Sequence, residues 1–238
     1  MFAAFSVIGF LDDAKKAIYK DPAGISGRTK MALQFLAAAA ILYYLSRHSL
    51  TNFSVPLFRT YSAHLGAIAF SVVALLLIVG STNAINFTDG LDGLLPAVAI
   101  PNYLFFFFIA HNFSVQVFCL IMVACLVGFL IFNAYPAKII MGDTGSMAIG
   151  GSLVTLAVME KVEILAPILF VIYFAEILSV MIQVPYFKRT GRRIFRMSPI
   201  HYHFGLKYGW SERRIVVFFS LVAWAAMIVS LAYYHFFL

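Results

Sequence analysis

The sequence predicts an all-α protein, a polytopic transmembrane helical bundle, and composition is the first reason. Hydrophobic residues make up 63% of the 238 residues and charged residues 11%. Soluble domains average about 45–50% apolar and about 25% charged residues. The mean hydropathy of +0.93 points the same way. Soluble, disordered and fibrous classes of protein are therefore excluded.

The length of the apolar runs is the second reason. A helix needs roughly 20 residues to cross about 30 Å of hydrocarbon. Seven runs meet this need and predict full spans, at residues 31–47, 64–85, 93–111, 114–134, 146–160, 163–184 and 214–237. Residues 1–11 are apolar but too short to cross, and they lack the cationic start and cleavage site of a signal peptide. We interpret them as a partial span, the tail of a longer helix, within a single membrane-embedded domain over residues 1–238.

The third reason is the distribution of positive charge. If eight helices alternate sides, the segments 12–30, 86–92, 135–145 and 185–214 share one face and hold 14 of the 17 Lys and Arg residues. The other face has Arg47, Arg59 and Lys161. Cytoplasmic loops carry such an excess of positive charge. The basic face is therefore predicted to be cytoplasmic, although attraction to anionic lipid alone would also explain its lysines and arginines.

Three groups of acidic residues lie at the same face. Asp12 and Asp13 end the partial span, Asp89 and Asp92 separate two long spans, and Asp143 opens another. Carboxylates are costly near hydrocarbon and are candidates for function. Mg²⁺ prefers one or two carboxylates with substrate phosphates. A metal at such a face would hold a diphosphate.

Local spacing refines this expectation. If the turn around Asp89 and Asp92 is helical, both side chains share a face. The free N–H groups at the helix start near Gly142 favour a phosphate. The simpler alternatives are that Asp143 is an ordinary N-cap and that Asp12 and Asp13 form a solvated helix end.

Basic and aromatic residues alternate in the last polar segment, 187–204, which is typical of an amphipathic piece at a membrane surface. A basic membrane anchor is the simpler interpretation. If the segment is extended, His201 and His203 share one face and can hydrogen-bond a phosphate or the substrate. Glu176 lies in the middle of a span and is predicted to be buried against a polar partner or to line the site.

Five motifs, in order, resemble one family. They are Gly-Phe-Leu-Asp-Asp, Asn-Phe-Thr-Asp-Gly-Leu-Asp-Gly, Phe-Asn-Ala-Tyr-Pro-Ala, Met-Gly-Asp-Thr-Gly-Ser and Phe-Arg-Met-Ser-Pro-Ile-His. From about residue 6 onward the chain resembles the phospho-N-acetylmuramoyl-pentapeptide transferases. These belong to the superfamily of polyprenyl-phosphate N-acetylhexosamine-1-phosphate transferases. The Ser-Pro-Ile-His stretch distinguishes the first group from its relatives, whose last loop reads differently.

The resemblance implies a fold, a reaction and partners. The family has ten spans, so the chain would match its last eight. The reaction would transfer phospho-N-acetylmuramoyl-pentapeptide from UDP-N-acetylmuramoyl-pentapeptide to undecaprenyl phosphate. It would yield lipid I and UMP for peptidoglycan synthesis, with Mg²⁺ as cofactor. The expected place is the bacterial cytoplasmic (inner) membrane with the site facing the cytoplasm; membrane lipids and a second copy of the chain are possible partners, and nucleic acid is not.

The resemblance also implies roles for individual residues. The catalytic residues would be Asp12, Asp13, Asp143, His201 and His203, with Asp12 as the candidate base. The substrate-binding residues would be Lys30, Asn86, Asp89, Asp92, Asn133, Gly142, Ser146 and Gln183. Asp143 would be the principal Mg²⁺ ligand, with Asn86 or Asp89 as another ligand. Two positions depart from the family: Tyr202 stands where a run of three histidines is usual, and Ile140 where a phenylalanine could stack on uracil.

Other functions stay open. A related enzyme would use a UDP-N-acetylhexosamine donor, which the histidine loop argues against. Transporters place their sites near the bilayer midplane, whereas only Glu176 is central here. A non-enzymatic scaffold is opposed by the retention of the motifs.

Overall fold

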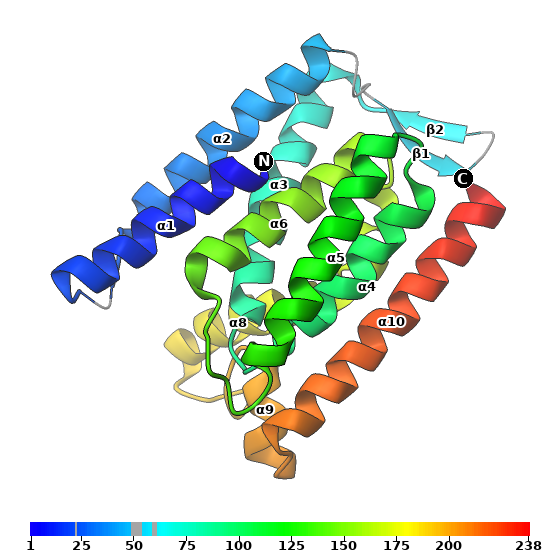
Figure 1. Ribbon diagram of the computed structural model, residues 1–238. Coiled ribbons are helices and arrows are strands. Elements are labelled where there is room, and N and C mark those ends of the chain that lie inside the picture. Colours follow the sequence, from blue (N-terminus) through cyan, green and yellow to red (C-terminus); the bar gives the residue numbers. More distant parts are fainter. Residues whose placement is uncertain (22, 49–53, 59–60) are drawn as a thin grey trace. The chain divides into compact units, whose positions relative to one another are not determined.

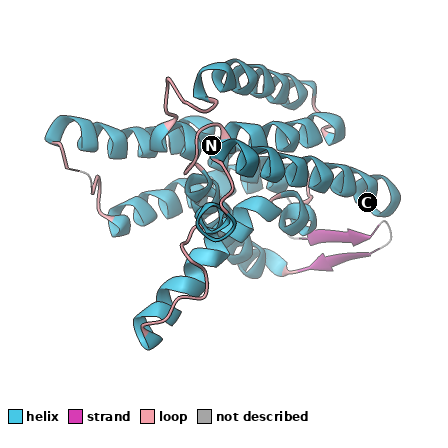
Figure 2. Cartoon of the chain, turned by 90° about the horizontal axis from the view of Figure 1, so that it is seen from below, coloured by secondary structure: helices cyan, strands magenta, loops and turns pink. Residues whose placement is uncertain are grey.

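The computed structural model describes residues 1–21, 23–48, 54–58 and 61–238, and it is almost entirely helical (Figures 1 and 2). Its elements in chain order are α1 (Phe2–Tyr19), α2 (Gly27–Arg47), β1 (Ser54–Phe58), β2 (Tyr61–His64), α3 (Gly66–Thr88), α4 (Leu94–Ile109), α5 (Phe113–Asn133), α6 (Gly142–Met159), η1 (Glu163–Leu165), α7 (Ala166–Leu169), α8 (Val171–Thr190), α9 (Ile200–Tyr208) and α10 (Glu212–Phe237).

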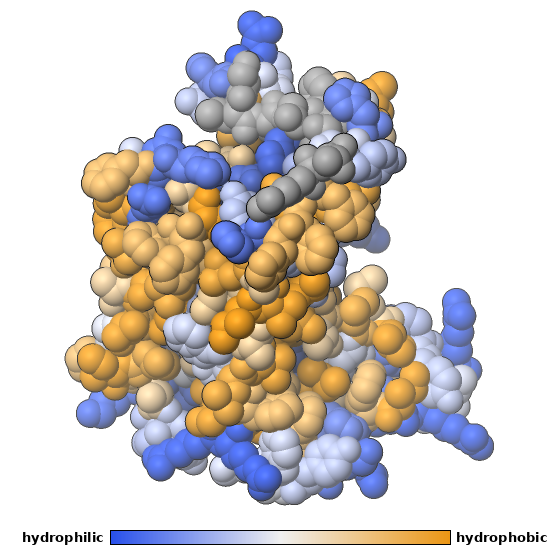
Figure 3. Space-filling model, turned by 90° about the vertical axis from the view of Figure 1, so that its right-hand side faces the viewer, coloured by the Kyte–Doolittle hydropathy of each residue, from blue (hydrophilic) through white to orange (hydrophobic). Residues whose placement is uncertain are grey.

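Among the described residues, five helices are long and apolar enough to cross a membrane. They are α2, α3, α5, α8 and α10. Apolar side chains also cover much of the face seen in Figure 3. The predicted helical membrane bundle is therefore confirmed, whereas the predicted count of seven full spans is not. The helix α4 is shorter than these five, and η1 and α7 precede α8 within the predicted run 163–184.

A β-hairpin interrupts the helical pattern, which the sequence analysis did not predict. Strands β1 and β2 pair antiparallel, with Val55 opposite Ala63 and a register shift between Pro56 and Phe58. Proline has no N–H to donate and is tolerated at such irregular positions. The Leu57 carbonyl accepts a hydrogen bond of 2.8 Å from the Tyr233 hydroxyl.

The chain forms two compact units. The first unit holds Met1–Asn86, Met141–Ala166 and Leu231–Leu238, and the second holds Phe87–Ile140 and Pro167–Ser230. Helices α1 and α6 pack against each other in the first unit, and α4 packs against α5 in the second. The candidate site residues are divided between the two units.

The helix α1 is longer than predicted. It continues through Asp12 and Asp13 and ends at Tyr19, where Lys20 adopts a left-handed conformation with φ of 52°. The expectation that the two aspartates end this helix is wrong. The residues after them include alanines and lysines, which favour helix, and Lys16 forms an ion pair with Asp12 one turn back.

Close packing of α1 on α6 depends on glycine. A Cβ on Gly9 would collide with the backbone of Asp143 and Thr144, and a Cβ on Gly151 would collide with Phe5. Small residues allow membrane helices to approach this closely. This contact places the end of α1 that carries the aspartates against the start of α6.

We expect Gly9→Ala to lower the free energy of unfolding by about 2–3 kcal/mol, because a backbone cannot move aside for the new methyl group. Gly80→Ala is the matched control, since no heavy atom lies within 4 Å of its added Cβ. That control should be neutral or stabilising by up to about 1 kcal/mol. Thermal unfolding in detergent measures both, and equal midpoints would contradict the packing argument.

An ion pair with an unusual environment lies at the start of η1 in the first unit, between Lys161 in the preceding turn and Glu163. Lys161 Nζ is 3.7 Å from Glu163 Oε1 and 4.4 Å from the centre of the Phe70 ring. Burial raises the pKa of Glu163 to about 7, although Lys161 opposes this rise. Burial also lowers the pKa of Lys161. Burial therefore disfavours the charged form of both side chains.

The raised pKa predicts how stability depends on pH. The stability that Glu163 contributes is fully present below its unfolded pKa of about 4.5 and is lost as the pH rises to about 7. Because glutamine does not ionise, we expect Glu163→Gln to remove this loss. Relative to the wild type, the free energy of unfolding of the variant should rise between pH 5 and pH 8 by on the order of 1–3 kcal/mol. Unfolding midpoints across this range measure it, and parallel curves would contradict it.

Candidate functional site

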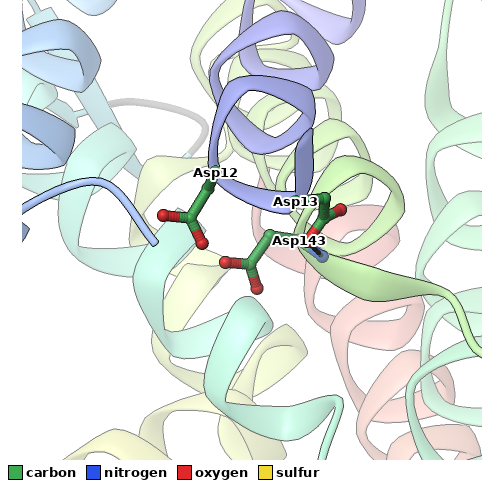
Figure 4. Close-up of side chains that lie close together, drawn as sticks. All are labelled: Asp12, Asp13 and Asp143. Atoms are coloured by element: carbon green, nitrogen blue, oxygen red, sulfur yellow. Dashed lines mark hydrogen bonds between the residues drawn. The ribbon is translucent and has the colours of Figure 1, made fainter. Parts of the chain in front are cut away.

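Three carboxylates meet where α1 approaches α6. Asp12 and Asp13 come from α1 and Asp143 from the first turn of α6 (Figure 4). One oxygen of each lies within 4.8 Å of an oxygen of the others. The sequence predicts all three as catalytic residues, and the structure brings them together.

Asp13 binds the start of α6. Its Oδ1 accepts the N–H of Asp143 at 3.2 Å, and its Oδ2 accepts the N–H and the hydroxyl of Thr144 at 2.8 and 2.6 Å. A carboxylate at a helix N-terminus satisfies free N–H groups and is stabilised by the dipole. The simpler alternative, in which Asp143 is an ordinary N-cap, is wrong, since that position is Met141, without a side-chain cap. The sequence predicts that the free N–H groups at this helix start bind a phosphate. In the structure, the N–H groups of Asp143 and Thr144 donate to Asp13.

Gly142 makes this arrangement possible. Its φ is +68°, which side chains rarely adopt, and a Cβ there would collide with Asp13 Oδ2. The prediction that Gly142 belongs to the site agrees with this position. Because Gly142 has no side chain, the Asp13 carboxylate can approach the backbone at the start of α6.

Asp12 is almost completely buried, with 3% of its surface exposed. Its Oδ1 accepts the N–H of Ile25 at 2.8 Å, and its Oδ2 is 2.6 Å from Lys16 Nζ. A Cβ on Gly24 would collide with this carboxylate. Gly24 and Ile25, which precede α2, therefore lie against Asp12, and both carboxylate oxygens have partners.

Two lysines converge on Asp143. Lys16 Nζ and Lys30 Nζ each lie 2.9 Å from Asp143 Oδ2. Three carboxylates and two ammonium groups give this cluster a net charge of 2 − 3 = −1. Lys30 was predicted as a phosphate partner. Lys16 was not predicted as a site residue. It lies four residues after Asp12, so a helix that continues through the aspartates places both side chains on one face.

Asn86 and Ser146 complete the surroundings of Asp143. Asn86 Nδ2 donates to Asp143 Oδ1 at 2.9 Å and to Ser146 Oγ at 2.7 Å, and Ser146 donates to the Gly142 carbonyl at 2.9 Å. Burial opposes ionisation of Asp143, but hydrogen bonds from Asn86 and the two lysines outweigh it. The pKa of Asp143 therefore lies well below its usual range.

The same contacts shift the pKa of Lys16. Burial lowers the pKa of Lys16, but its hydrogen bonds to Asp12 and Asp143 outweigh this effect and raise the pKa above its ordinary value. Lys16 therefore carries its charge at neutral pH.

The donor set suits a magnesium ion. Carboxylate oxygens are the ligands that Mg²⁺ prefers, and it keeps waters or substrate phosphates on its other positions. Asp143 offers such oxygens beside Asp12 and Asp13, and the ammonium groups of two lysines lie against the same carboxylate. The predicted ligand Asn86 lies beside Asp143. Asp89, the other predicted ligand, belongs to the second unit.

In the second unit, Asp92 and Asn133 organise two loops. Asp92 Oδ2 accepts the N–H of Ala137 at 2.8 Å. Asn133 Oδ1 accepts the N–H of Gly93 at 3.0 Å, and its Nδ2 donates to the Ile139 carbonyl at 2.8 Å. Helix α3 ends at Thr88 and a turn follows it, so the condition under which Asp89 and Asp92 share a helical face is not met.

His201 is buried in contact with Glu176. Its Nδ1 lies 3.0 Å from Glu176 Oε2, neither side chain is exposed, and its backbone N–H donates to the same oxygen at 3.3 Å. The prediction of a polar partner for Glu176 is confirmed. A Cβ on Gly90 would collide with His201 Nε2, and the Tyr202 hydroxyl donates to the Gly90 carbonyl at 3.1 Å. The imidazole therefore lies against the turn after α3.

His203 has different surroundings. The histidines lie in the helix α9, so the condition under which both share one face, an extended segment, is not met. His203 Nδ1 accepts the N–H of Arg196 at 2.9 Å. Partial burial, followed by the charges of Lys207 and Arg196, lowers the pKa of His203. His203 is thus a neutral acceptor for this loop.

Gln183 also binds this loop. Its Oε1 accepts the N–H groups of Ile194 and Phe195 at 3.0 and 3.1 Å, and its Nε2 donates to the Phe195 carbonyl at 3.0 Å. Gln183 therefore joins α8 to the basic segment that precedes α9.

Comparisons with known proteins show which proteins this chain resembles. A family model for glycosyl transferase family 4 matches residues 1–161. The chain is 46% identical over 224 residues to the phospho-N-acetylmuramoyl-pentapeptide-transferase of Geobacillus kaustophilus, covering 92% of this chain and 68% of that protein. It is 42% identical to the protein of that name from Clostridium acetobutylicum (93% and 70% covered), and 38% identical to the one from Neisseria meningitidis serogroup C (96% and 69%).

Proposed function

Because the chain belongs to glycosyl transferase family 4 and, within it, to the phospho-N-acetylmuramoyl-pentapeptide-transferases, we propose that it transfers phospho-N-acetylmuramoyl-pentapeptide from UDP-N-acetylmuramoyl-pentapeptide to undecaprenyl phosphate. The products are lipid I and UMP. The observation that carries this proposal is the cluster of Asp12, Asp13 and Asp143 with two lysines on Asp143. Transfer to a phosphate requires positioning of anionic groups and neutralisation of their charge, which such a cluster supplies.

Each residue of the cluster takes a different part in this proposal. Mg²⁺ held by Asp143, with Asp12, Asp13 or Asn86 beside it, would neutralise the charge of the diphosphate. Lys16 and Lys30 would bind phosphate oxygens of the substrates, since the ammonium groups of both already contact the Asp143 carboxylate. Asp13 keeps the start of α6 in place through its bonds to Asp143 and Thr144.

We assign Asp12 a positioning role and not the role of a general base. Both its oxygens have partners, Ile25 and Lys16, so the carboxylate holds Lys16 toward Asp143. A phosphate monoester is already largely ionised at pH 7, with a second pKa near 6. The attacking lipid phosphate therefore gains little from proton removal.

The remaining predicted residues complete the proposal. Asp89, Asp92, Asn133, Gln183, His201 and His203 would bind the nucleotide sugar or shape the loops that do, together with Asn86, Gly142 and Ser146. The site would face the cytoplasm from the bacterial inner membrane, because the basic residues gather on that predicted side. A homodimer is a further prediction, checked by the mass of the detergent-solubilised protein.

The test is release of UMP in detergent from UDP-N-acetylmuramoyl-pentapeptide and undecaprenyl phosphate. We expect release with Mg²⁺ and its loss when a chelator removes the metal, with recovery when Mg²⁺ is restored. UDP-N-acetylglucosamine is the competing donor. Release with the hexosamine donor alone would assign the protein to the related transferases, and release that persists in the chelator would overturn the metal proposal.

A further inference from the structure

A groove of about 470 Å³ runs along α10 in the second unit. Its α10 side is a single stripe of side chains spaced three and four residues apart, which includes Val217, Leu221 and Trp224. These three are 59%, 63% and 37% exposed. The opposite wall comes from α4 and α5, through residues such as Ala97 and Leu130. Since α10 is one of the membrane-spanning helices, the groove opens within the hydrocarbon layer.

The groove has a cationic end. Arg213 lines it at the first turn of α10 and is exposed. Its guanidinium lies 5.5 Å from the centre of the Tyr135 ring, and Nη2 donates to the Tyr135 carbonyl at 3.2 Å. A guanidinium has five N–H donors in a fork that matches a phosphate. The positive end of the α10 dipole lies at the same turn.

One acidic residue also lines this end, and its carboxylate is engaged. Asp92 Oδ2 accepts the N–H of Ala137 at 2.8 Å. The neighbouring Arg214 lies 4.5 Å from the centre of the Trp210 ring and is not among the lining residues. Of the residues that the structure describes, Arg213 and Asp92 are therefore the two charged groups at this end of the groove. The Asp92 carboxylate is engaged by a backbone N–H, whereas Arg213 keeps N–H donors beyond the one that Tyr135 accepts.

We propose that this groove binds an anionic phospholipid, with one acyl chain along Val217, Leu221 and Trp224 and the phosphate on Arg213. Arg213 and the apolar stripe follow one another along α10, with the charge at the end of a spanning helix, where headgroups lie. The volume falls in the range of about 300–1,000 Å³ for small-ligand sites. The undecaprenyl chain is several times longer than an acyl chain, so a phospholipid fits better. This lipid would bind whether or not the chain performs the proposed transfer.

The two tryptophans of the chain, Trp210 and Trp224, allow a direct test. In the full chain carrying Trp210→Phe, fluorescence comes from Trp224 in the groove. The protein is reconstituted in phosphatidylcholine vesicles that contain a small fraction of phosphatidylglycerol with brominated chains, since bromine quenches tryptophan on contact. The reciprocal Trp224→Phe protein reports Trp210 alone.

We expect brominated phosphatidylglycerol to quench Trp224 with an apparent affinity about fivefold higher than brominated phosphatidylcholine, as one arginine near an anionic headgroup favours it by about this factor. Arg213→Gln should abolish the preference. Arg214→Gln is the matched control and should retain it, because that arginine does not line the groove.

Two outcomes would overturn the proposal. Equal quenching by both headgroups would show only the lipid that surrounds any membrane protein. Absence of quenching by either lipid would mean that something else, such as a second copy of the chain, covers the groove. A preference that survives Arg213→Gln but is lost with Arg214→Gln would also overturn the assignment of the phosphate to Arg213.

Discussion

Replacing Asp143 by asparagine should reduce UMP release at least about 100-fold, which is the usual cost of removing one strong electrostatic contact from a reacting centre. The substitution keeps the size of the side chain but removes the charge that Lys16 and Lys30 both contact at 2.9 Å. It also weakens the donor set for Mg²⁺. Initial rates at saturating Mg²⁺ measure the loss.

The control for this substitution is Asp21→Asn. Asp21 lies in the loop after α1, where it is 3.6 Å from Lys15 and accepts the N–H of Ala23. We expect full activity from this variant. A normal unfolding midpoint for Asp143→Asn would show that the loss is chemical, whereas activity close to the wild type would remove Asp143 from the centre of the site.

The helical membrane bundle could be predicted because hydropathy reports it directly. Runs of apolar residues near 20 in length have few alternatives in a chain this poor in charge. The same signal cannot locate helix ends inside polar sequence. Asp12 and Asp13 interrupt the apolar run, so hydropathy ended the helix there, whereas the ion pair between Asp12 and Lys16 and the following helix formers extend it to Tyr19.

The β-hairpin escaped prediction for a related reason. Its strands are four and five residues long, and such short apolar runs do not distinguish strand from helix. The hydrogen bond from Tyr233 to Leu57 joins positions 176 residues apart. A contact of that kind has no local signature.

The identity of the site residues could be predicted better than their contacts. Carboxylates near a membrane are costly, so Asp12, Asp13 and Asp143 were recognisable as candidates. Their individual partners were not, because Asp13 caps α6 across 131 positions. The histidines show the same limit: periodicity could not decide whether 200–208 is helical, and the helix separates His201 from His203.

The buried pair of Glu176 and His201 leads to the largest expected effect on stability. Neither side chain is exposed, and Nδ1 lies 3.0 Å from Oε2. Glu176→Leu would leave a buried imidazole without its partner. Breaking a buried pair in this way costs about 3–5 kcal/mol, which corresponds to a fall of roughly 6–20 °C in the unfolding midpoint for a chain of this size.

A double-mutant cycle separates this packing effect from catalysis. Replacing both partners of a buried pair by apolar residues is often neutral, so Glu176→Leu combined with His201→Leu should recover most of the lost stability. Activity should not recover, since His201 would no longer lie against the turn at Gly90. Unfolding midpoints and UMP release of the wild type, both single variants and the double variant complete the cycle. Additive losses of stability would mean that the two side chains do not stabilise one another, and an active double variant would exclude His201 from the reaction.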